Sequence, residues 1–290
     1  MRNWLKDKYV VLSGVSGGIG KELCKLLICR YGARVIGIAR SEEKIKRLQE
    51  ELGDKAEWLQ YHLFDVSERQ NWLTLANTLK EQGVYPNLLI NNAGAFPTFS
   101  RTLETDVQTV ERIIKTNYLS TVYAISALSP LLLGNKKDKR AIVNVCSSSA
   151  LCAVVGTAAY SASKAAIKGY TEALQMEEKG RTYVGILYPG TTQTELFRDD
   201  ENTQNSALQK IAMPAEKMAK KMAKAILKKK KRAIIGWDAK CMNFVAKLMP
   251  VKGLALIAWV MKISKSKVFT EVFKESEQIE VESKNENNRE

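Results

Sequence analysis

The chain has 290 residues, of which 45% are apolar and 26% are charged, as in an ordinary soluble globular protein. It contains no continuous apolar stretch of about 18 residues, so no transmembrane helix is predicted. Its start lacks the apolar segment of a signal peptide, so export is not expected. The five cysteines have no metal-like spacing and indicate reduced thiols in the cytoplasm. With a single histidine, no metal site is expected.

The net charge of +14 is concentrated in one part of the chain. Residues 210–267 contain sixteen Lys or Arg and two acids, so they carry the whole excess, and the remaining residues are balanced. The charge alone would fit a nucleic-acid partner. The segment has no recognisable motif for reading nucleic acid, however, so we do not expect a nucleic-acid partner. The basic charge therefore belongs to the last quarter of the chain and not to the domain before it.

Strand-like and helix-like segments alternate through residues 1–236. Apolar runs rich in β-branched residues predict strands at 9–14, 33–40, 56–64, 87–94, 140–148, 183–190 and 233–237. Amphipathic segments between them predict helices at 18–32, 41–53, about 67–82, about 104–133, about 157–179 and 214–230. Apolar strands separated by helices indicate a seven-stranded parallel sheet with helices on both faces, which is a doubly wound α/β fold of Rossmann type.

The first strand–helix turn, "SGVSGGIG", favours a dinucleotide site. Its Gly14, Gly18 and Gly20 let the backbone approach a pyrophosphate at a helix N-terminus. Turns are often rich in glycine, but the position directly after the first strand supports the assignment. The second strand ends in Arg40 and Ser41, where an acid would bind the ribose hydroxyls of NAD. An arginine fork suits a 2′-phosphate, so NADP(H) is expected, with a solvated arginine as the alternative.

Six short motifs occur in the order typical of the classical short-chain dehydrogenases/reductases, which the chain resembles. They are "SGVSGGIG" (13–20), "NNAG" (91–94), Asn117 in "IIKTNYLS", Ser147, "YSASK" (160–164) and "PGTTQT" (189–194). The resemblance covers residues 8–194 and extends more loosely to about 236. Two positions depart from the family pattern, because Ser13 replaces a threonine and Cys146 replaces the first of two serines.

The resemblance implies a catalytic set of Asn117, Ser147, Tyr160 and Lys164. Tyr160 and Lys164 are four residues apart, so a helix places them on the same face; an ordinary helical pair is the alternative. Tyr160 would be the acid in ketone reduction and the base in alcohol oxidation, and the Lys164 ammonium would lower the pKa of its phenol. By resemblance, Ser147 donates a hydrogen bond to the substrate oxygen, and Asn117 holds a water that passes protons to Lys164.

The resemblance also assigns cofactor contacts position by position. Asp65 would contact the adenine. The backbone of Thr192 would contact the carboxamide of the nicotinamide, and Thr194 would contact the pyrophosphate. Lys164 would also hold the hydroxyls of the nicotinamide ribose. The expected cofactor-binding residues are Gly14, Ser16, Gly18, Ile19, Gly20, Arg40, Ser41, Asp65, Val66, Asn91, Ala93, Gly94, Tyr160, Lys164, Pro189, Gly190, Thr192 and Thr194.

Three regions are predicted along the chain. Residues 1–236 form a Rossmann-fold catalytic domain, with a polar segment at 191–213 as a substrate lid. Residues 237–274 form a basic, apolar helical extension, and the composition of residues 275–290 predicts a disordered tail. Apolar helices flanked by lysines and containing tryptophan suit the surface of an anionic membrane, here through residues 237–269. A helix that covers the pocket or contacts another subunit is an equally open interpretation.

The predicted function is an NADP(H)-dependent oxidoreductase that interconverts a secondary alcohol and a ketone. Apolar residues of the lid, together with Phe96 and Phe99, indicate a hydrophobic substrate, with a hydroxysteroid or bile acid as the first choice. The alternatives are a 3-oxoacyl or other lipid-intermediate reductase and, from a different class, a non-catalytic NADP(H)-binding regulator or membrane adaptor. We expect a homo-oligomer, a dimer or a tetramer, in the cytoplasm or peripheral on a membrane.

Overall fold

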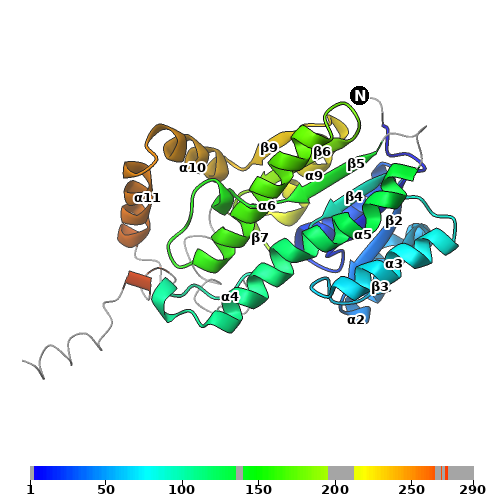
Figure 1. The fold of residues 1–290 in the computed structure, drawn as a ribbon, viewed down its shortest axis with the longest axis horizontal. Helices are drawn as coiled ribbons and strands as arrows, with labels where there is room; N and C mark the ends of the chain where they lie inside the picture. The colour runs from blue at the N-terminus through cyan, green and yellow to red at the C-terminus, as the bar shows by residue number, and fades with distance from the viewer. Residues whose placement is uncertain (1–2, 135–139, 195–211, 265–268, 270–271, 274–290) are drawn as a thin grey trace, which may run out of the picture.

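A parallel sheet of seven strands forms the centre of the protein in the computed structural model (Figure 1). The model describes residues 3–134, 140–194, 212–264, 269 and 272–273. The strand order is β3-β2-β1-β4-β5-β6-β9, and every pairing is parallel, which confirms the predicted fold class. The strands are β1 (Tyr9–Ser13), β2 (Arg34–Ala39), β3 (Leu59–Leu63), β4 (Leu88–Asn91), β5 (Ala141–Val145), β6 (Tyr183–Pro189) and β9 (Arg232–Ile235).

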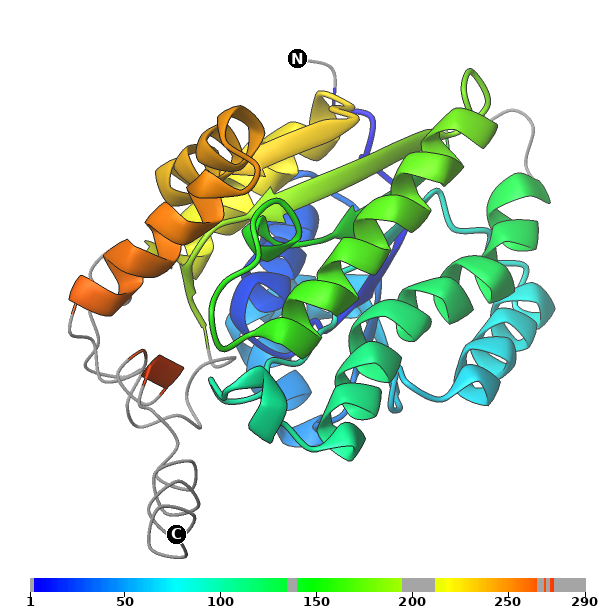
Figure 2. The ribbon, with the colours of Figure 1, turned by 60° about the vertical axis from the view of Figure 1, so that its left-hand side comes forward.

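Helices cover both faces of the sheet, because successive strand residues point to opposite sides. Val10 and Leu12 of β1 pack with α1, α2 and α9 in one apolar cluster, whereas Val11 packs with α3 and α5 in another. Figure 2 shows the two helical layers on either side of the strands. The covering helices are α1 (Gly18–Lys25), α2 (Glu42–Leu52), α3 (Arg69–Glu81), α4 (Val107–Ile114), α5 (Ser120–Gly134), α6 (Ala158–Glu177) and α9 (Ala215–Leu227).

The predicted helix at about 104–133 is divided in the structure. A short 3-10 turn, η3 (Thr102–Glu104), precedes α4, which starts where Asp106 accepts a hydrogen bond from the N–H of Thr109 (2.8 Å). A π-helical turn, η4 (Lys115–Leu119), then separates α4 from α5. Such turns insert one extra residue and are frequent at functional sites. Apolar periodicity does not reveal either interruption.

Other boundaries follow local signals. Ser41 caps α2, since its hydroxyl accepts a hydrogen bond from the N–H of Lys44 (3.3 Å). A π-helical turn, η1 (Leu26–Arg30), continues α1, and a 3-10 turn, η2 (Gly53–Trp58), shortens β3 relative to the predicted 56–64. Gly53, the last residue of the predicted helix at 41–53, has a φ of +54° and caps the end of α2.

Beyond the sheet, the chain forms two further pairs of elements. The short strands β7 (Thr192–Gln193) and β8 (Met213–Pro214) form a small parallel pair. Most of the predicted lid, residues 195–211, lies outside the described residues, and so does the predicted tail at 275–290. After β9, the extension forms α10 (Trp237–Leu248) and α11 (Lys252–Ile263), two helices in contact with each other. Among the helices that are described, none has the length and apolar character needed to cross a membrane.

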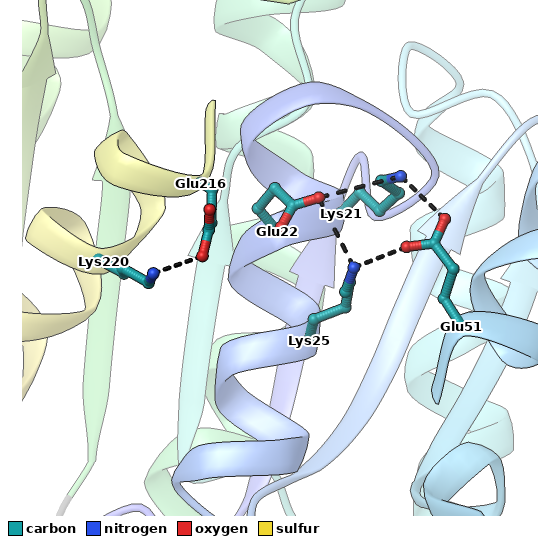
Figure 3. Close-up of polar contacts among 6 residues, drawn as sticks. All are labelled: Lys21, Glu22, Lys25, Glu51, Glu216 and Lys220. Carbon is teal, nitrogen blue, oxygen red and sulfur yellow. Dashed lines mark hydrogen bonds and ion pairs between the residues drawn. The ribbon is translucent and has the colours of Figure 1, made fainter. Parts of the chain in front are cut away.

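A cluster of charged side chains joins α1 to α2 (Figure 3). Glu51, near the end of α2, accepts hydrogen bonds from the ammonium groups of Lys21 (2.9 Å) and Lys25 (2.6 Å). A groove of about 680 Å³ lies next to this cluster, between α1 and the start of α9, where Glu216 pairs with Lys220. Exposed ion pairs contribute at most about 1 kcal/mol each. This region contains none of the predicted site residues.

Candidate active site

At Gly14 and Gly20, the turn after β1 leaves no room for a side chain. Gly14 has a φ of +73°, a conformation that favours glycine. A Cβ atom on Gly20 would collide with the carbonyl oxygen of Gly14. Gly18, the first residue of α1, lies beside Thr194, whose Cβ would be 3.1 Å from a Cβ added there. Ser16, like Gly18, is half-buried in the turn, as is Ile19 in the first turn of α1. The turn therefore fits a pyrophosphate at the helix N-terminus.

Arg40 and Asp65 follow neighbouring strands, β2 and β3, at the same edge of the sheet. Arg40 is exposed, and the carboxylate of Asp65 accepts a hydrogen bond from the N–H of Ser67 (2.8 Å). Burial acts to raise the pKa of Asp65, but the hydrogen bonds of Ser67 and the charges of Arg40 and Lys115 outweigh it and lower the pKa. Val66 is buried beside them. Cationic and anionic side chains thus meet where the adenosine end of a dinucleotide is expected.

The "NNAG" turn is hydrogen-bonded to the end of β1. The Ser13 hydroxyl accepts hydrogen bonds from the N–H groups of Asn92 and Ala93 (3.0 Å each), so a serine suffices where the family usually has threonine. Asn91 donates its side-chain N–H to the Oδ1 atom of Asn144 (2.8 Å), which links β4 to β5. These bonds fix the turn of Asn91, Ala93 and Gly94, which are expected to bind the cofactor.

Asn117 lies fully buried in the π-helical turn η4, at the centre of a polar network. Its Oδ1 atom accepts a hydrogen bond from the N–H of Ala95 (2.7 Å), and its Nδ2 atom donates to the carbonyl of Ala95 (3.0 Å) and to the hydroxyl of Ser163 (2.9 Å). A Cβ atom on Gly94 would lie 3.2 Å from Oδ1 of Asn117 and 3.3 Å from the ammonium of Lys164. Asn117 and Lys164 therefore flank the same glycine.

Ser147, which follows β5, comes together with Tyr160 and Lys164 near the start of α6, and all three are buried. The Lys164 nitrogen lies 5.6 Å from the centroid of the Tyr160 ring and 3.4 Å from the carbonyl oxygen of Val145. The Ser147 hydroxyl accepts a hydrogen bond from the N–H of Ser149 (3.2 Å), which holds it at the start of a 3-10 turn. The four residues predicted as the catalytic set are thus neighbours in space.

The protonation of this site is set mainly by burial. Burial raises the pKa of Tyr160 to about 12, although the neighbouring Ser147 hydroxyl acts in the opposite direction. Burial lowers the pKa of Lys164. In the protein alone, desolvation of the phenolate outweighs any lowering of its pKa by the Lys164 ammonium, and the proposed effect of Lys164 on the phenol stays a prediction. Tyr160 carries its proton at neutral pH and is ready to act as an acid.

A row of aromatic rings leads from Tyr160 to the end of the described chain. Phe96 contacts Tyr160 and Phe99, with ring centroids 5.0 Å apart in both pairs, and Phe99 contacts Phe269 at 5.6 Å. Phe269 is buried, and so is Val272 against Gly156. Sequence reasoning did not single out these two C-terminal residues. The signal for them is weak, since they belong to two short apolar pairs, Val268–Phe269 and Val272–Phe273, among polar residues.

The loop after β6 is held by α10. Thr191 donates its backbone N–H to Oδ2 of Asp238 (2.6 Å), in the first turn of α10, and a Cβ on Gly190 would collide with the same carboxylate. The hydroxyl of the buried Thr192 donates to the carbonyl of Gly190 (2.9 Å). Pro189 ends β6 immediately before this loop. Sequence reasoning counted Asp238 only as a charge, because nothing in its neighbourhood signals a contact with residues 190–191.

Comparison with known proteins agrees with this arrangement. The family model of the short chain dehydrogenases matches residues 8–205. The chain is 33% identical to an NADPH-dependent pterin aldehyde reductase of Arabidopsis thaliana over 188 residues, 65% of this chain and 76% of that protein. It is 31% identical to a 3-ketodihydrosphingosine reductase of Mus musculus over 252 residues, 81% of this chain and 73% of that protein. A short chain dehydrogenase from Escherichia coli CFT073, solved with NADPH, superposes with a TM-score of 0.71 at 25% identity, covering 81% of this chain and 98% of that one.

Proposed function

The chain belongs to the short chain dehydrogenase family, and on that premise we propose that it interconverts a ketone and a secondary alcohol with NADP(H). The observation that carries the proposal is the buried group of Ser147, Tyr160 and Lys164 beside Asn117. A protein that only bound the cofactor would have no need of a phenol placed beside a hydroxyl and an ammonium. NADP(H) as the cofactor is supported by the glycine turn, by Arg40 and by the similar structure that holds NADPH.

Each residue has a distinct part in the proposed reduction. When bound, NADPH would supply a hydride for the carbonyl carbon. Ser147 donates a hydrogen bond to the carbonyl oxygen, which positions the substrate and stabilises the negative charge that develops there. Tyr160 donates its proton to the same oxygen, so that the alcohol forms. Lys164 returns a proton towards Tyr160, and Asn117 would hold a water that passes protons to Lys164. In alcohol oxidation, the same proton passes back to Tyr160.

We propose that the substrate is hydrophobic, because the row of Phe96, Phe99 and Phe269 forms an apolar wall next to Tyr160. A hydroxysteroid or bile acid is the first choice from the sequence. The ketone of a lipid intermediate is the second candidate, favoured by the similarity to 3-ketodihydrosphingosine reductases of Bos taurus and Mus musculus. Both candidates present a ketone on a large apolar body.

A turnover panel tests this proposal. The purified protein is given NADPH or NADH with a ketosteroid, a keto bile acid, a 3-oxoacyl thioester and 3-ketodihydrosphingosine, and loss of the reduced cofactor is followed. We expect NADPH to be consumed with at least one of these and NADH to be used less well. Absence of turnover with every ketone, together with tight NADPH binding, would instead support a cofactor-binding regulator.

We further propose that the enzyme is a homo-oligomer of the cytoplasm that associates peripherally with a membrane. All five cysteines are free thiols in the structure, which supports a reducing compartment. Light scattering at several protein concentrations measures the oligomeric state. A lipophilic substrate would partition into membranes, so association with their surface would bring the enzyme to its substrate.

A further inference from the structure

Exposed apolar side chains are concentrated on α10 and α11. Ten of the fifteen large apolar side chains that are exposed in the described residues lie within residues 237–263. Trp237, Phe244 and Leu248 are each more than 60% exposed, and Trp259 is 58% exposed. A soluble protein seldom gathers so many apolar side chains on one surface unless that surface binds a partner or a membrane. We call residues 237–263 the docking hairpin.

Both helices of the docking hairpin turn an apolar stripe towards solvent. In α10 the stripe is Trp237, Phe244 and Leu248, whose spacing of seven and four residues places them on one helical face. In α11 it is Leu256, Trp259 and Ile263, spaced by three and four residues. The exposed lysines Lys240, Lys247, Lys252 and Lys262 lie along the hairpin. Apolar faces bordered by lysine are typical of helices that lie in a membrane interface.

A basic groove lies next to α10. It has a volume of about 250 Å³ and runs between α9, β9 and the first turn of α10. Its described lining holds six exposed cations and no carboxylate: Lys221, Lys224, Lys228, Lys230, Arg232 and Lys240. The volume is below the roughly 300–1,000 Å³ of pockets that enclose a small molecule. The groove therefore suits a compact anionic group and not a whole lipophilic ligand.

One cation of the groove is held in a fixed orientation. The Arg232 guanidinium lies 5.4 Å from the centroid of the Tyr188 ring and donates a hydrogen bond to Oδ1 of Asn243 (3.1 Å), in α10. Arginine in such a setting keeps further N–H groups for a phosphate, which it binds with a planar fork. The contact with Asn243 also ties the groove to the docking hairpin.

We propose that the docking hairpin and the basic groove together bind the surface of an anionic membrane, with lipid phosphates in the groove and the apolar stripes in the interface. Positive charge next to exposed aromatic and aliphatic side chains complements anionic headgroups above an apolar layer. A nucleic acid would use the cations but leave the stripes in water. A second copy of the chain would bring two basic surfaces together, and like charges repel.

The position of the docking hairpin adds to the proposal. Because β9 is parallel to β6, α10 starts at the edge of the sheet that holds Ser147 and the loop after Pro189, and Asp238 contacts that loop. Docking would therefore place the active-site edge of the sheet near the membrane. The proposal does not depend on the reductase activity, since a surface could bind vesicles whatever the protein catalyses.

Vesicle co-sedimentation with the full-length protein tests the proposal. We expect binding to vesicles of phosphatidylcholine mixed with phosphatidylserine, weak binding to phosphatidylcholine alone, and release as salt rises above about 0.1 M. Lys224→Glu with Lys228→Glu should weaken binding by at least about tenfold, and the neutral pair Lys224→Gln with Lys228→Gln by less. Trp259→Ser should weaken binding to the same anionic vesicles.

Matched variants control for net charge and for lost apolar surface. Lys80→Glu with Lys179→Glu changes the same number of exposed cations outside the groove, and Met176→Ser removes an exposed apolar side chain from α6. Neither should alter vesicle binding. Reduction of a soluble ketone without vesicles, measured in parallel, separates this test from that of the proposed function, and all variants should retain it.

Four results would overturn the proposal. The protein could remain in the supernatant with anionic vesicles at low salt, or it could bind neutral vesicles equally well. In a third case, the groove variants would lose binding to an RNA or DNA duplex while vesicle binding stayed unchanged. In a fourth case, Trp259→Ser would change the oligomeric state, measured by light scattering, and leave vesicle binding unchanged. That result would mean that the apolar stripes contact a second copy of the chain.

Discussion

Tyr160 holds its proton more firmly than a phenol in water does. Its pKa is raised to about 12 by burial, above the usual value of about 10, so the protonated form predominates through the physiological range. The neighbouring Lys164, whose own pKa is lowered by burial, does not reverse this. Without bound cofactor, the phenol is therefore in the form that can donate a proton to a substrate oxygen.

This leads to a prediction about pH. Reduction uses the protonated phenol, so its kcat/KM, which reports the free enzyme, should show no loss from Tyr160 between about pH 6 and 9. Oxidation requires the phenolate and should become faster as pH rises across that range. Rate profiles in both directions measure the effect. A kcat/KM for reduction that declines as pH rises through about 7 would contradict the assignment.

A second prediction concerns Arg40 and the choice of cofactor. Arg40→Asp should shift preference from NADP(H) towards NAD(H), because a carboxylate repels the 2′-phosphate. A charge-assisted contact is worth about 1.5–3 kcal/mol, so the ratio of the two kcat/KM values should change about tenfold or more. Arg47→Asp, which alters an exposed arginine of α2 that pairs with Glu43, is the control and should leave the ratio unchanged. Equal use of both cofactors by the unaltered protein would refute the role of Arg40.

The identity of the site residues is the part that sequence could predict. Spacing along one helix is enough to place Tyr160 and Lys164 together, and the motif order adds Asn117 and Ser147. The pKa of Tyr160 was not predictable in this way, because it depends on how fully the fold buries the phenol. Asp238 was missed for a similar reason, since its contact with Thr191 joins residues that are distant in sequence.

Among the elements, the turn between β1 and α1 is the one most constrained by packing. Gly20→Ala places a Cβ against the carbonyl oxygen of Gly14, so the turn must shift. We expect a loss of about 1–3 kcal/mol in the free energy of unfolding and weaker NADPH binding. Thermal unfolding and cofactor titration measure the two effects. Unchanged affinity for NADPH would show that the turn does not bind it.

Gly169→Ala provides the matched control. Gly169 is exposed in the middle of α6, and a Cβ there meets no atom within 4 Å. Alanine is favoured over glycine inside helices, so this variant should gain about 0.5–1 kcal/mol in stability and bind NADPH normally.

Periodicity predicted which elements exist, and it failed where the backbone departs from a regular helix or strand. The seven strands and the helices between them follow from apolar patterns. The π-helical turn that holds Asn117 does not, because one inserted residue barely disturbs a run of apolar positions. The extension was likewise identified as helical, but its division at Met249–Val251 into α10 and α11 went unpredicted.

Across the whole molecule, the C-terminal end of the described chain meets the catalytic centre through the rings of Phe269 and Phe99. Phe269→Ala should remove part of the apolar wall. We expect kcat/KM to fall by about tenfold or more for a large hydrophobic ketone and little for a small one, because an apolar pocket discriminates by the contacts it makes.

Phe244→Ala is the control for Phe269→Ala, since Phe244 is a phenylalanine of the same extension that is 63% exposed, whereas Phe269 is buried. Steady-state kinetics without vesicles compare the two variants. An equal effect of Phe269→Ala on large and small ketones would mean that the residue supports the fold and does not line the pocket. Such long-range contacts are not predictable from local patterns, which explains why sequence left the role of the extension open.

The central claim is that Tyr160 delivers the proton in an NADPH-dependent reduction. Its most direct test is a single turnover of Tyr160→Phe with bound NADPH and a ketone that the unaltered protein reduces, with Tyr170→Phe, on the same helix, as control. We expect NADPH affinity to be nearly unchanged and the rate of NADPH oxidation to fall about 10²–10⁴-fold, as for loss of a general acid. Lys164→Ala should reduce both the NADPH affinity and the rate of NADPH oxidation. A near-normal rate in Tyr160→Phe would contradict the account.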